Sequence, residues 1–268
     1  MNIRALTAHD FDNLIDCLLK AFEGYFVEFP TDKKYWKNRF KAARVDMSLC
    51  YAAFENERMI GFIITGVDVH KGKKTAFNSG TGVLKEFRGR KLVDQIYNYA
   101  FPHFRNAGIK KCMLEVITEN YKAIRVYERI GFKIDRKLLC YSGFISPVEQ
   151  VFITPSAFDE IPDKFKKAEL YAWDHMDEAI AIAEPDSFLV KDRNGILAGY
   201  ITLNTSNGNI YQIDALPNNY DLVLSAIALV SKKVKINNID SSRVELIEAI
   251  EKKNLLNTIN QWEMEMTI

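Results

Sequence analysis

Apolar residues follow two different periods along the first half of the chain. A short extended run from Met1 to Leu6 predicts a strand, and apolar residues at helical spacing predict a helix from Phe11 to Phe22. A second helix is predicted from Lys33 to Ala43. Three apolar runs then predict strands at residues 49–54, 59–67 and 75–83. The predicted order is therefore strand, helix, helix and three strands.

The third of these strands leads into a basic turn and a further helix, between Gly80 and Val93. The turn, Arg88-Gly89-Arg90-Lys91, combines three cations with a glycine, and helical apolar spacing continues beyond it. A helix N-terminus presents unpaired amides and the positive end of the helix dipole, so the turn suits a phosphate group. The alternative is an ordinary joint between a strand and a helix with solvated charges.

The pattern continues with a strand at 109–117, a short helix at 120–130 and a return strand from Phe132 to Tyr141. Asn120 is a suitable N-cap for the short helix. Gly131 stands where a left-handed residue is expected to end it.

The second half repeats this order of elements after a segment rich in proline. Residues 142–167 contain three prolines, which predicts a boundary between domains at 1–145 and 146–268. Beyond it the spacing predicts helices at 173–183, 220–231 and 241–253, and strands at 187–191, 196–203, 209–215, 234–239 and 261–268. The order favours a duplicated fold, and the alternative is an unrelated α/β domain.

Length and charge are consistent with two ordinary globular domains. The chain has 268 residues, of which 48% are hydrophobic, so two sizeable cores can be built. Its 36 basic and 35 acidic residues nearly cancel. This balance argues against a broad nucleic-acid-binding face, although a local basic patch is compatible with it.

The cysteines and the apolar runs indicate a cytoplasmic protein with no metal site. The four cysteines lie far apart without metal-ligand spacing, as is typical of reduced, buried thiols. The segment after Met1 lacks the apolar core of a signal peptide, and no apolar run is long enough to cross a bilayer. We therefore expect no membrane partner.

The order of elements and two motifs resemble the GNAT superfamily of acyl-CoA N-acyltransferases. That family has an Asn-x-x-Ala-x-x-x-Tyr-x-x-x-Gly-Phe motif, and this chain matches it at Asn120, Ala123, Tyr127, Gly131 and Phe132. The resemblance covers Met1 to about Ser142. It implies an α/β fold with a mixed sheet (α+β), here as tandem GNAT-like modules of which the second is degenerate.

The family's Arg/Gln-x-x-Gly-x-Gly/Ala turn, which holds the coenzyme A pyrophosphate, is matched less closely. Arg88 occupies the Arg/Gln place, but Lys91 stands at the first glycine and Val93 at the Gly/Ala place. A helical φ is open to lysine, and its ammonium can pair with a phosphate. We therefore expect Lys91 to point outward or onto the phosphates.

The resemblance implies acetyl-CoA as co-substrate and transfer of its acetyl group to a primary amine of a small molecule or peptide. The implied cofactor contacts are Gly82, Val83, Arg88, Gly89, Arg90, Lys91, Leu92, Val93, Asn120 and Ala123. Tyr127 is implied as the general acid, because a phenol stays protonated at neutral pH and can donate to the leaving thiolate. The alternative for Tyr127 is a half-buried core tyrosine.

The acceptor side is less defined. Residues 23–32 are aromatic and acidic, which suits a cationic amine, and they include Tyr25 and Glu28. The alternative is a loop that packs on the core. Glu115 lies near the expected cleft, and the general base is left open among Glu115, Glu28, His70 and a water relay.

The second module lacks the residues of both motifs. Its turn at 215–219 has neither arginine nor glycine, and its last helix has no tyrosine, so we expect no coenzyme A binding of the usual kind. We expect it to serve as a scaffold for the substrate cleft. Two alternatives to acetyl transfer stay open: a non-catalytic acyl-CoA-binding or interaction protein, and a transferase with a bulkier donor or a hydroxyl acceptor. The oligomeric state is not predicted.

Overall fold

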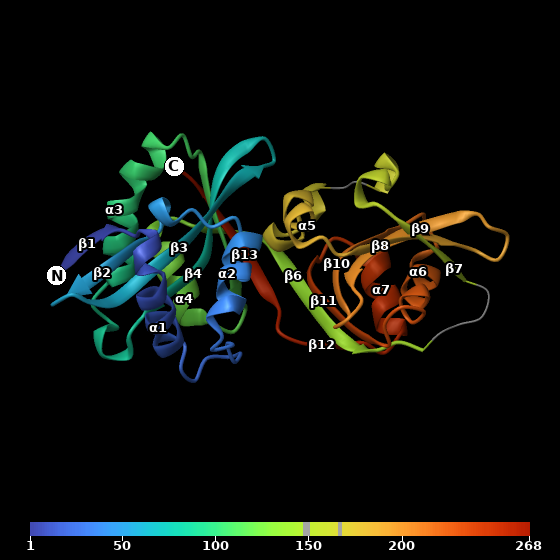
Figure 1. The fold of residues 1–268 in the computed structure, drawn as a ribbon, viewed down its shortest axis with the longest axis horizontal. Coiled ribbons are helices and arrows are strands. Elements are labelled where there is room, and N and C mark those ends of the chain that lie inside the picture. Colours follow the sequence, from blue (N-terminus) through green and yellow to red (C-terminus); the bar gives the residue numbers. More distant parts are fainter. Residues whose placement is uncertain (147–150, 166–167) are drawn as a thin grey trace. The chain divides into compact units, whose positions relative to one another are not determined.

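The computed structural model of the chain describes residues 1–146, 151–165 and 168–268. These residues form two compact units, of which unit 1 contains Met1–Asp135 and Glu263–Ile268 and unit 2 contains Arg136–Trp262 (Figure 1). Both are mixed α/β structures, so the predicted fold class is confirmed. Residues 147–150 and 166–167, in the segment predicted as the domain boundary, lie outside the described residues.

Unit 1 contains the predicted elements in the predicted order. Its helices are α1 (Phe11–Ala21), α2 (Lys33–Ala42), α3 (Leu92–Asn106) and α4 (Tyr121–Ile130). Its strands are β1 (Asn2–Ala5), β2 (Tyr51–Glu55), β3 (Arg58–His70), β4 (Lys73–Val83), β5 (Lys111–Ile117) and β13 (Gln261–Thr267).

The sheet of unit 1 has the order β1-β2-β3-β4-β5-β13. Neighbours from β1 to β4 are antiparallel, and β4 pairs with β5 in parallel. A Cβ added at Gly82 would lie 3.0 Å from the Ala21 side chain of α1, whereas one added at Gly61 would lie 3.8 Å from Ile96 of α3. Gly61 and Gly82 face opposite sides of the sheet because their cross-strand partners are adjacent residues, so α1 and α3 cover opposite faces.

The last strand of the chain belongs to unit 1, which differs from the predicted division at 145/146. β13 lies beside β5, and its Met264 is completely buried. In turn β6 (Lys133–Phe144), which follows the last helix of unit 1, lies beside β11 (Lys233–Asp240) in the sheet of unit 2. Local hydrophobic spacing shows that a strand exists but not which sheet receives it, so this exchange was not predictable from spacing.

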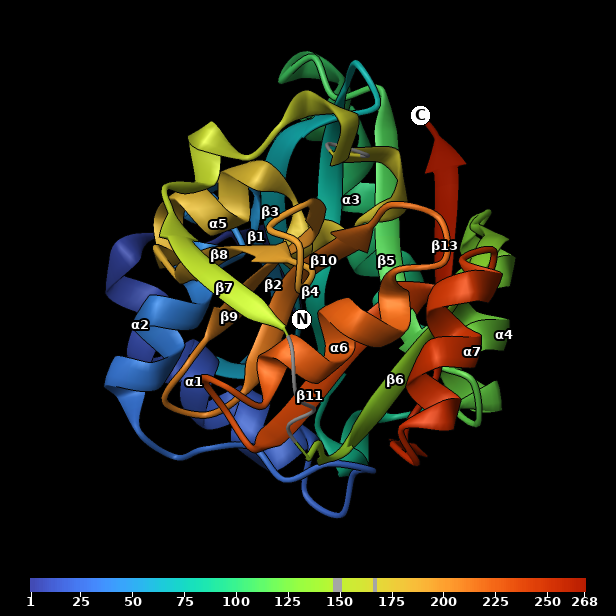
Figure 2. The same cartoon turned by 90° about the vertical axis from the view of Figure 1, so that its right-hand side faces the viewer.

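Unit 2 repeats the architecture. Its further strands are β7 (Phe152–Ser156), β8 (Asp186–Lys191), β9 (Leu197–Asn204), β10 (Asn209–Ala215) and β12 (Leu256–Asn257). Its helices are α5 (Asp177–Ala183), α6 (Tyr220–Ile227) and α7 (Val244–Lys252), and Figure 2 shows α6 and α7 side by side. The sheet order is β6-β11-β10-β9-β8-β7.

The start of one helix and the presence of β7 and β12 in unit 2 differ from the predictions. The helix expected from Trp173 begins only at Asp177, because residues 173–175 form a separate 3-10 turn. β7 was not predicted, since it contains Pro155. A proline is tolerated there because β7 is an edge strand, where one side needs no partner.

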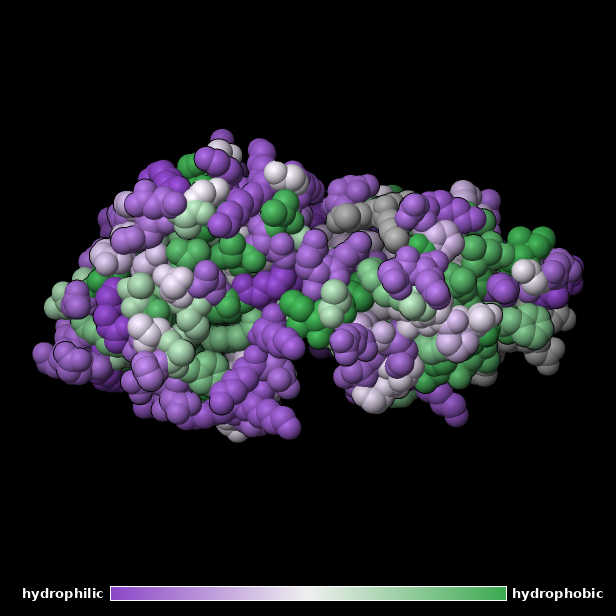
Figure 3. All heavy atoms as spheres, turned by 45° about the horizontal axis from the view of Figure 1, so that its top comes forward, coloured by the Kyte–Doolittle hydropathy of each residue, from purple (hydrophilic) through white to green (hydrophobic). Residues whose placement is uncertain are grey.

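Polar side chains are frequent on the surface (Figure 3), and the four thiols lie in the interior. Hydrophilic side chains cover much of the face shown in Figure 3. The four cysteines are free and buried, and burial raises the pKa of Cys17, Cys50 and Cys112 to about 12, so these thiols are unreactive at neutral pH. Among the helices in the described parts of the chain, none is long and apolar enough to cross a membrane.

Candidate active site

β4 and β5 separate in the middle of the sheet of unit 1. Their parallel pairing runs from Thr75 opposite Lys111 to Asn78 opposite Leu114. At that point Ser79 is an extra residue, since β3 pairs Thr65 with Asn78 but Ile64 with Gly80. This β-bulge leaves the following residues of β4 beyond the pairing with β5. A gap between two parallel strands is thus formed at the C-terminal half of β4.

One backbone N–H of β4 directed into this gap belongs to Val83. Leu84 donates its N–H to Ile60 O at 3.0 Å, toward β3. Because successive residues of a strand direct their polar groups to opposite sides, Val83 directs its N–H toward β5 and Gly82 directs its own toward β3. Such an N–H can donate to a carbonyl oxygen that gains negative charge.

Gly82 is required by packing within the protein. A Cβ at this position would lie 2.5 Å from Cζ of Phe62, which is shorter than any real contact. The strand predicted around Gly82 therefore uses glycine to admit the ring of Phe62 beneath it. Nothing in this contact involves the gap.

The cation of Arg88 is engaged by the protein. Its Nε donates to Val83 O at 3.2 Å, and its Nη2 donates to Ala21 O at 2.7 Å, at the end of α1. Arg90 is exposed, with its guanidinium carbon 4.8 Å from the centroid of the Phe87 ring. Arg88 thus attaches the turn to β4 and α1. The geometry supports this structural role for its side chain better than contact with a phosphate.

The turn before α3 has two residues with positive φ. Gly89 has a φ of 81°, and Lys91, the N-cap of α3, has φ 52° and ψ 35°. The expectation of a helical φ for Lys91 is wrong, because the chain needs a left-handed residue at the position where the family motif has glycine. The side chain of Lys91 is exposed.

The start of α3 offers a set of backbone donors. The first helical bond runs from Gln95 N–H to Lys91 O at 3.1 Å, so the N–H groups of Leu92, Val93 and Asp94 precede the helical ladder. Leu92 is buried, which anchors this end of the helix in the core. Together with the left-handed residues, this arrangement suits an anion.

Replacing Lys91 with glycine is expected to raise the free energy of unfolding by up to about 1 kcal/mol. A left-handed conformation costs a non-glycine residue about 1–2 kcal/mol, and the greater flexibility of glycine in the unfolded chain offsets part of that gain. Gly89→Ala is the matched control and should lower the free energy by a similar amount. Urea denaturation measures both, and a less stable Lys91→Gly would contradict the assigned strain.

Asn120 caps α4 and holds the aromatic loop. Its Oδ1 accepts the N–H of Ala123 at 3.2 Å, and its Nδ2 donates to Oη of Tyr25 at 3.3 Å. The N-cap prediction is confirmed. The contact with Tyr25 brings two predicted site residues together, from segments far apart in the sequence.

The loop that carries Tyr25 packs by its aromatic rings. The ring of Tyr25 lies 4.8 Å from that of Phe22 and 5.1 Å from that of Phe26, and the side chain of Phe26 is 51% exposed. Trp36 Nε1 donates to Pro30 O at 2.8 Å, which closes the loop on α2. Glu28 is exposed on the same loop. The loop therefore packs on unit 1 and also presents a polar group and an apolar ring to the solvent.

Tyr127 lies at the gap with its phenol enclosed. The residue is 9% exposed, and Asn78 Nδ2 lies 3.5 Å from its Oη. Burial raises the pKa of Tyr127, and the hydrogen bond with Thr81 opposes this rise only in part. The phenol consequently stays protonated at neutral pH.

Asn78, Thr81 and Tyr97 lie at the gap but were not identified from the sequence. Asn78 Nδ2 donates to Oγ1 of Thr81 at 2.7 Å and to Oη of Tyr97 at 2.9 Å. The asparagine at position 78 could have indicated these contacts, because asparagine is unfavourable within a strand unless its amide has hydrogen-bond partners.

The candidate bases lie in different places. Glu115 is partly buried on β5, on the face shared with Lys111 and opposite to that of Leu114. His70 of β3 pairs with Lys73 of β4. Lys73 precedes Asn78 by five residues, so the two positions are roughly 16 Å apart along the strand. Its Nδ1 lies 3.1 Å from Nζ of Lys111. The structure therefore separates His70 from the gap.

Lys111 is part of a structural ion pair. Its Nζ lies 2.9 Å from Oε2 of Glu265 on β13. Burial opposes ionisation of Glu265, but the hydrogen bond from Lys111 and the nearby cations hold the pKa of that carboxyl below its usual range. In the described ranges, no group of three or more His, Cys, Asp or Glu residues is arranged to hold a metal ion.

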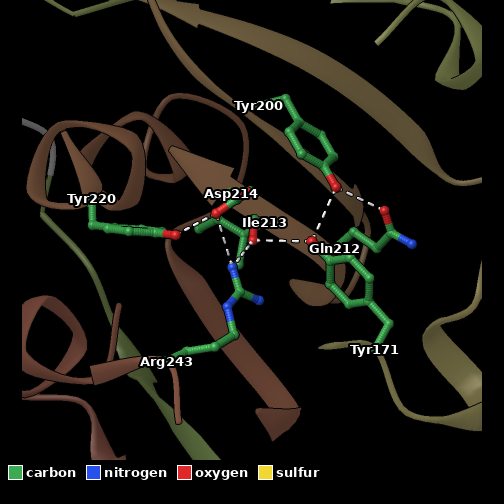
Figure 4. A network of polar contacts seen from close by, with 7 residues as sticks. All are labelled: Tyr171, Tyr200, Gln212, Ile213, Asp214, Tyr220 and Arg243. Carbon is green, nitrogen blue, oxygen red and sulfur yellow. Dashed lines mark hydrogen bonds and ion pairs between the residues drawn. The ribbon is translucent and has the colours of Figure 1, made fainter. Parts of the chain in front are cut away.

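Unit 2 contains a corresponding gap that is filled by its own side chains (Figure 4). β10 and β11 pair in parallel only at Asn209 and Ile210, and β10 then has a register shift before Gln212. Arg243, the N-cap of α7, donates through Nη2 to Ile213 O at 2.6 Å and to Oδ1 of Asp214 at 3.2 Å. Arg243 thus occupies the place at the start of the helix that Asn120 occupies in unit 1.

Tyrosines complete this buried network. Tyr171 donates to Ile213 O at 3.2 Å, Tyr200 donates to Oε1 of Gln212 at 2.7 Å, and Tyr220 donates to Asp214. Burial disfavours the charge of Arg243, but the surrounding Tyr171, Tyr220 and Asp214 hold its pKa above the usual value. The carbonyl of Ile213 and the space beside it are therefore already used by the protein.

Comparison with known proteins shows that unit 1 is similar to acetyltransferases. Residues 13–132 match the Acetyltransferase (GNAT) family. N-alpha-acetyltransferase 30 of Schizosaccharomyces pombe is 29% identical over 92 residues, which are 34% of this chain and 61% of that protein. N-alpha-acetyltransferase MAK3 of Arabidopsis thaliana is 26% identical over 93 residues, 35% of this chain and 49% of that protein. The chain thus matches about half to three fifths of these relatives' lengths.

Solved structures with the same fold extend over both units. A putative acetyltransferase from Pyrococcus horikoshii has a TM-score of 0.68 at 16% identity and covers 100% of this chain and 89% of its own. A tandem GNAT protein from the clavulanic acid biosynthesis pathway has a TM-score of 0.65 at 12% identity, with 99% and 98% covered. The tandem arrangement of two GNAT-like folds is confirmed, and residues 13–132 match the acetyltransferase (GNAT) family.

Proposed function

We propose that unit 1 transfers an acetyl group from acetyl-CoA to a primary amine of a small molecule or peptide. The observation that carries this proposal is the buried phenol of Tyr127 at the gap between β4 and β5. The donors at the start of α3 supply a matching place for a pyrophosphate. The names of the relatives, N-alpha-acetyltransferases, support a peptide amine as acceptor.

The residues at the gap have complementary tasks in this reaction. The N–H of Val83 stabilises negative charge on the thioester oxygen, and Tyr127 donates its proton to the departing thiolate. Leu92, Val93 and the left-handed turn at Lys91 hold the phosphates through their backbone N–H groups. Ala123, in the first turn of α4, is small enough to leave room for the pantetheine arm.

The amine approaches from the loop that carries Tyr25. The exposed carboxylate of Glu28 and the neighbouring rings attract a cationic amine. Glu115, on the face of β5 opposite to Leu114, is the protein base that we favour for neutralising the amine. A water relay is the alternative, and the position of His70 removes it from the candidates.

Titration with coenzyme A should give one binding site per chain. In unit 1 the pairing of β4 with β5 ends at Asn78, whereas in unit 2 Arg243 and Tyr171 already occupy the carbonyl of Ile213. Isothermal titration calorimetry measures the stoichiometry, and two sites would contradict the interpretation of unit 2.

Release of free thiol from acetyl-CoA in the presence of a panel of amines and peptides tests the activity. Binding of coenzyme A without turnover on the whole panel would favour the alternative of a non-catalytic acyl-CoA-binding protein. Absence of binding would contradict both functions.

A further inference from the structure

Asn78 links the bulge of β4 to the hydroxyl groups at the gap. Its Oδ1 accepts the N–H of Gly80 at 3.0 Å, directly after the extra residue of the bulge. Its Nδ2 reaches Thr81 at 2.7 Å, Tyr97 at 2.9 Å and Tyr127 at 3.5 Å. One amide therefore contacts both the backbone that shapes the gap and the phenol beside it.

The backbone bond fixes which way the amide of Asn78 faces. If the amide were turned over, its NH₂ group would meet the N–H of Gly80, donor against donor. The group that faces the hydroxyls is thus the NH₂, which can only donate. The oxygens of Thr81 and Tyr97 each accept one of its two hydrogens.

This assignment limits the direction of the contact with Tyr127. The NH₂ of Asn78 lies 3.5 Å from Oη of Tyr127, and as a group that only donates it cannot accept the phenol proton. The proton of Tyr127 is therefore directed away from this amide and is available to a group in the gap.

We propose that Asn78 is a positioning residue that directs the proton of Tyr127 toward the leaving thiolate. The inference rests on the proposed acetyl transfer. In that reaction the amine nitrogen forms a bond to the carbonyl carbon, the C–S bond breaks, and the thiolate takes the proton of Tyr127. The nitrogen loses one proton, and one proton from solvent restores the phenol, so the products are an acetamide and free coenzyme A.

Asn78 also stabilises Tyr127 after the proton has left. The NH₂ of Asn78, whose hydrogens bond Thr81 and Tyr97, has the positive end of its dipole 3.5 Å from the phenol oxygen, and this favours the phenolate over the phenol. It thereby opposes the effect of burial on the pKa of Tyr127. A carboxylate in place of the amide would reverse this contribution.

Asn78→Asp tests the direction of donation with almost no change of shape. The carboxylate still accepts the N–H of Gly80, but it accepts from the hydroxyls where Asn78 donates. We expect kcat to fall about 10²-fold, at the lower end of the range for general acid catalysis, with KM for acetyl-CoA changed less than about threefold. Thr81→Val, which removes one of the two closest acceptors of the Asn78 amide, should lower kcat about 10-fold and serves as a second variant.

An acetyl thioester of a more acidic thiol provides the readout that distinguishes positioning from a structural effect. Such a thiolate departs without a proton, so the ratio of wild-type to Asn78→Asp rates should fall at least about 10-fold on this donor. Equal ratios on both donors, or a wild-type kcat in Asn78→Asp, would overturn the proposal. If the role of Asn78 is overturned in this way but Tyr127→Phe is still impaired in the same assay, the proposed acetyl transfer stands without that role. A wild-type chain without turnover would overturn both.

Discussion

Replacing Tyr127 with phenylalanine is expected to lower kcat by about 10²–10⁴-fold, because the variant has no proton to give to the leaving thiolate. The ring remains in its place against Phe132, whose centroid lies 5.8 Å away, so folding and coenzyme A affinity should be retained. Steady-state kinetics with acetyl-CoA and the best amine measure the effect, and calorimetry measures the affinity.

The matched control is Tyr121→Phe, on the same helix but 66% exposed, and it should behave as the wild type. Because burial raises the pKa of Tyr127, the acid stays protonated through neutral pH. The rate of the wild type should accordingly not decline between pH 7 and about 10 through loss of this proton. An unchanged kcat in Tyr127→Phe would remove the assigned role and leave Tyr127 as a core residue.

Replacing Arg243 with methionine is expected to lower the free energy of unfolding of unit 2 by about 3–5 kcal/mol. Asp214 is fully buried, and its Oδ1 lies 3.2 Å from Nη2 of Arg243. Methionine fills part of the volume but leaves the carboxylate without this cation. Urea denaturation monitored by tryptophan fluorescence measures the change, since Trp173 is buried in unit 2.

Two further variants separate the charge effect from loss of packing. Arg193→Met removes an exposed arginine of the same unit and should change stability by less than about 0.5 kcal/mol. Asp214→Asn added to Arg243→Met removes the buried charge and should recover part of the loss. If Arg243→Met unfolds at the same urea concentration as Arg193→Met, the network does not stabilise unit 2.

The elements and the family could be predicted because they depend on local patterns. Helical spacing predicts α1, α3 and α4, and the spacing from Asn120 to Phe132 matches the family motif on α4. The N-cap at Asn120 is a short-range interaction, since Ala123 is three residues away. These features need no knowledge of which segments meet.

The conformation of the basic turn was only partly predictable. The sequence placed the turn before α3, but the φ of Lys91 and the engagement of Arg88 by Ala21 were not expected. Ala21 is 67 residues from Arg88 along the chain. A contact over such a separation has no periodic signal.

The sequence by itself indicated two α/β folds of one kind and placed a motif that resembles the GNAT family at residues 120–132 of the first. The tertiary structure decided that β13 completes unit 1, that Asn78 contacts Tyr127, and that Arg243 fills the second gap. Each of these depends on packing between segments distant in the chain. Hydrophobic spacing specifies which face of an element is buried, whereas the partner on that face is selected only when the whole core assembles.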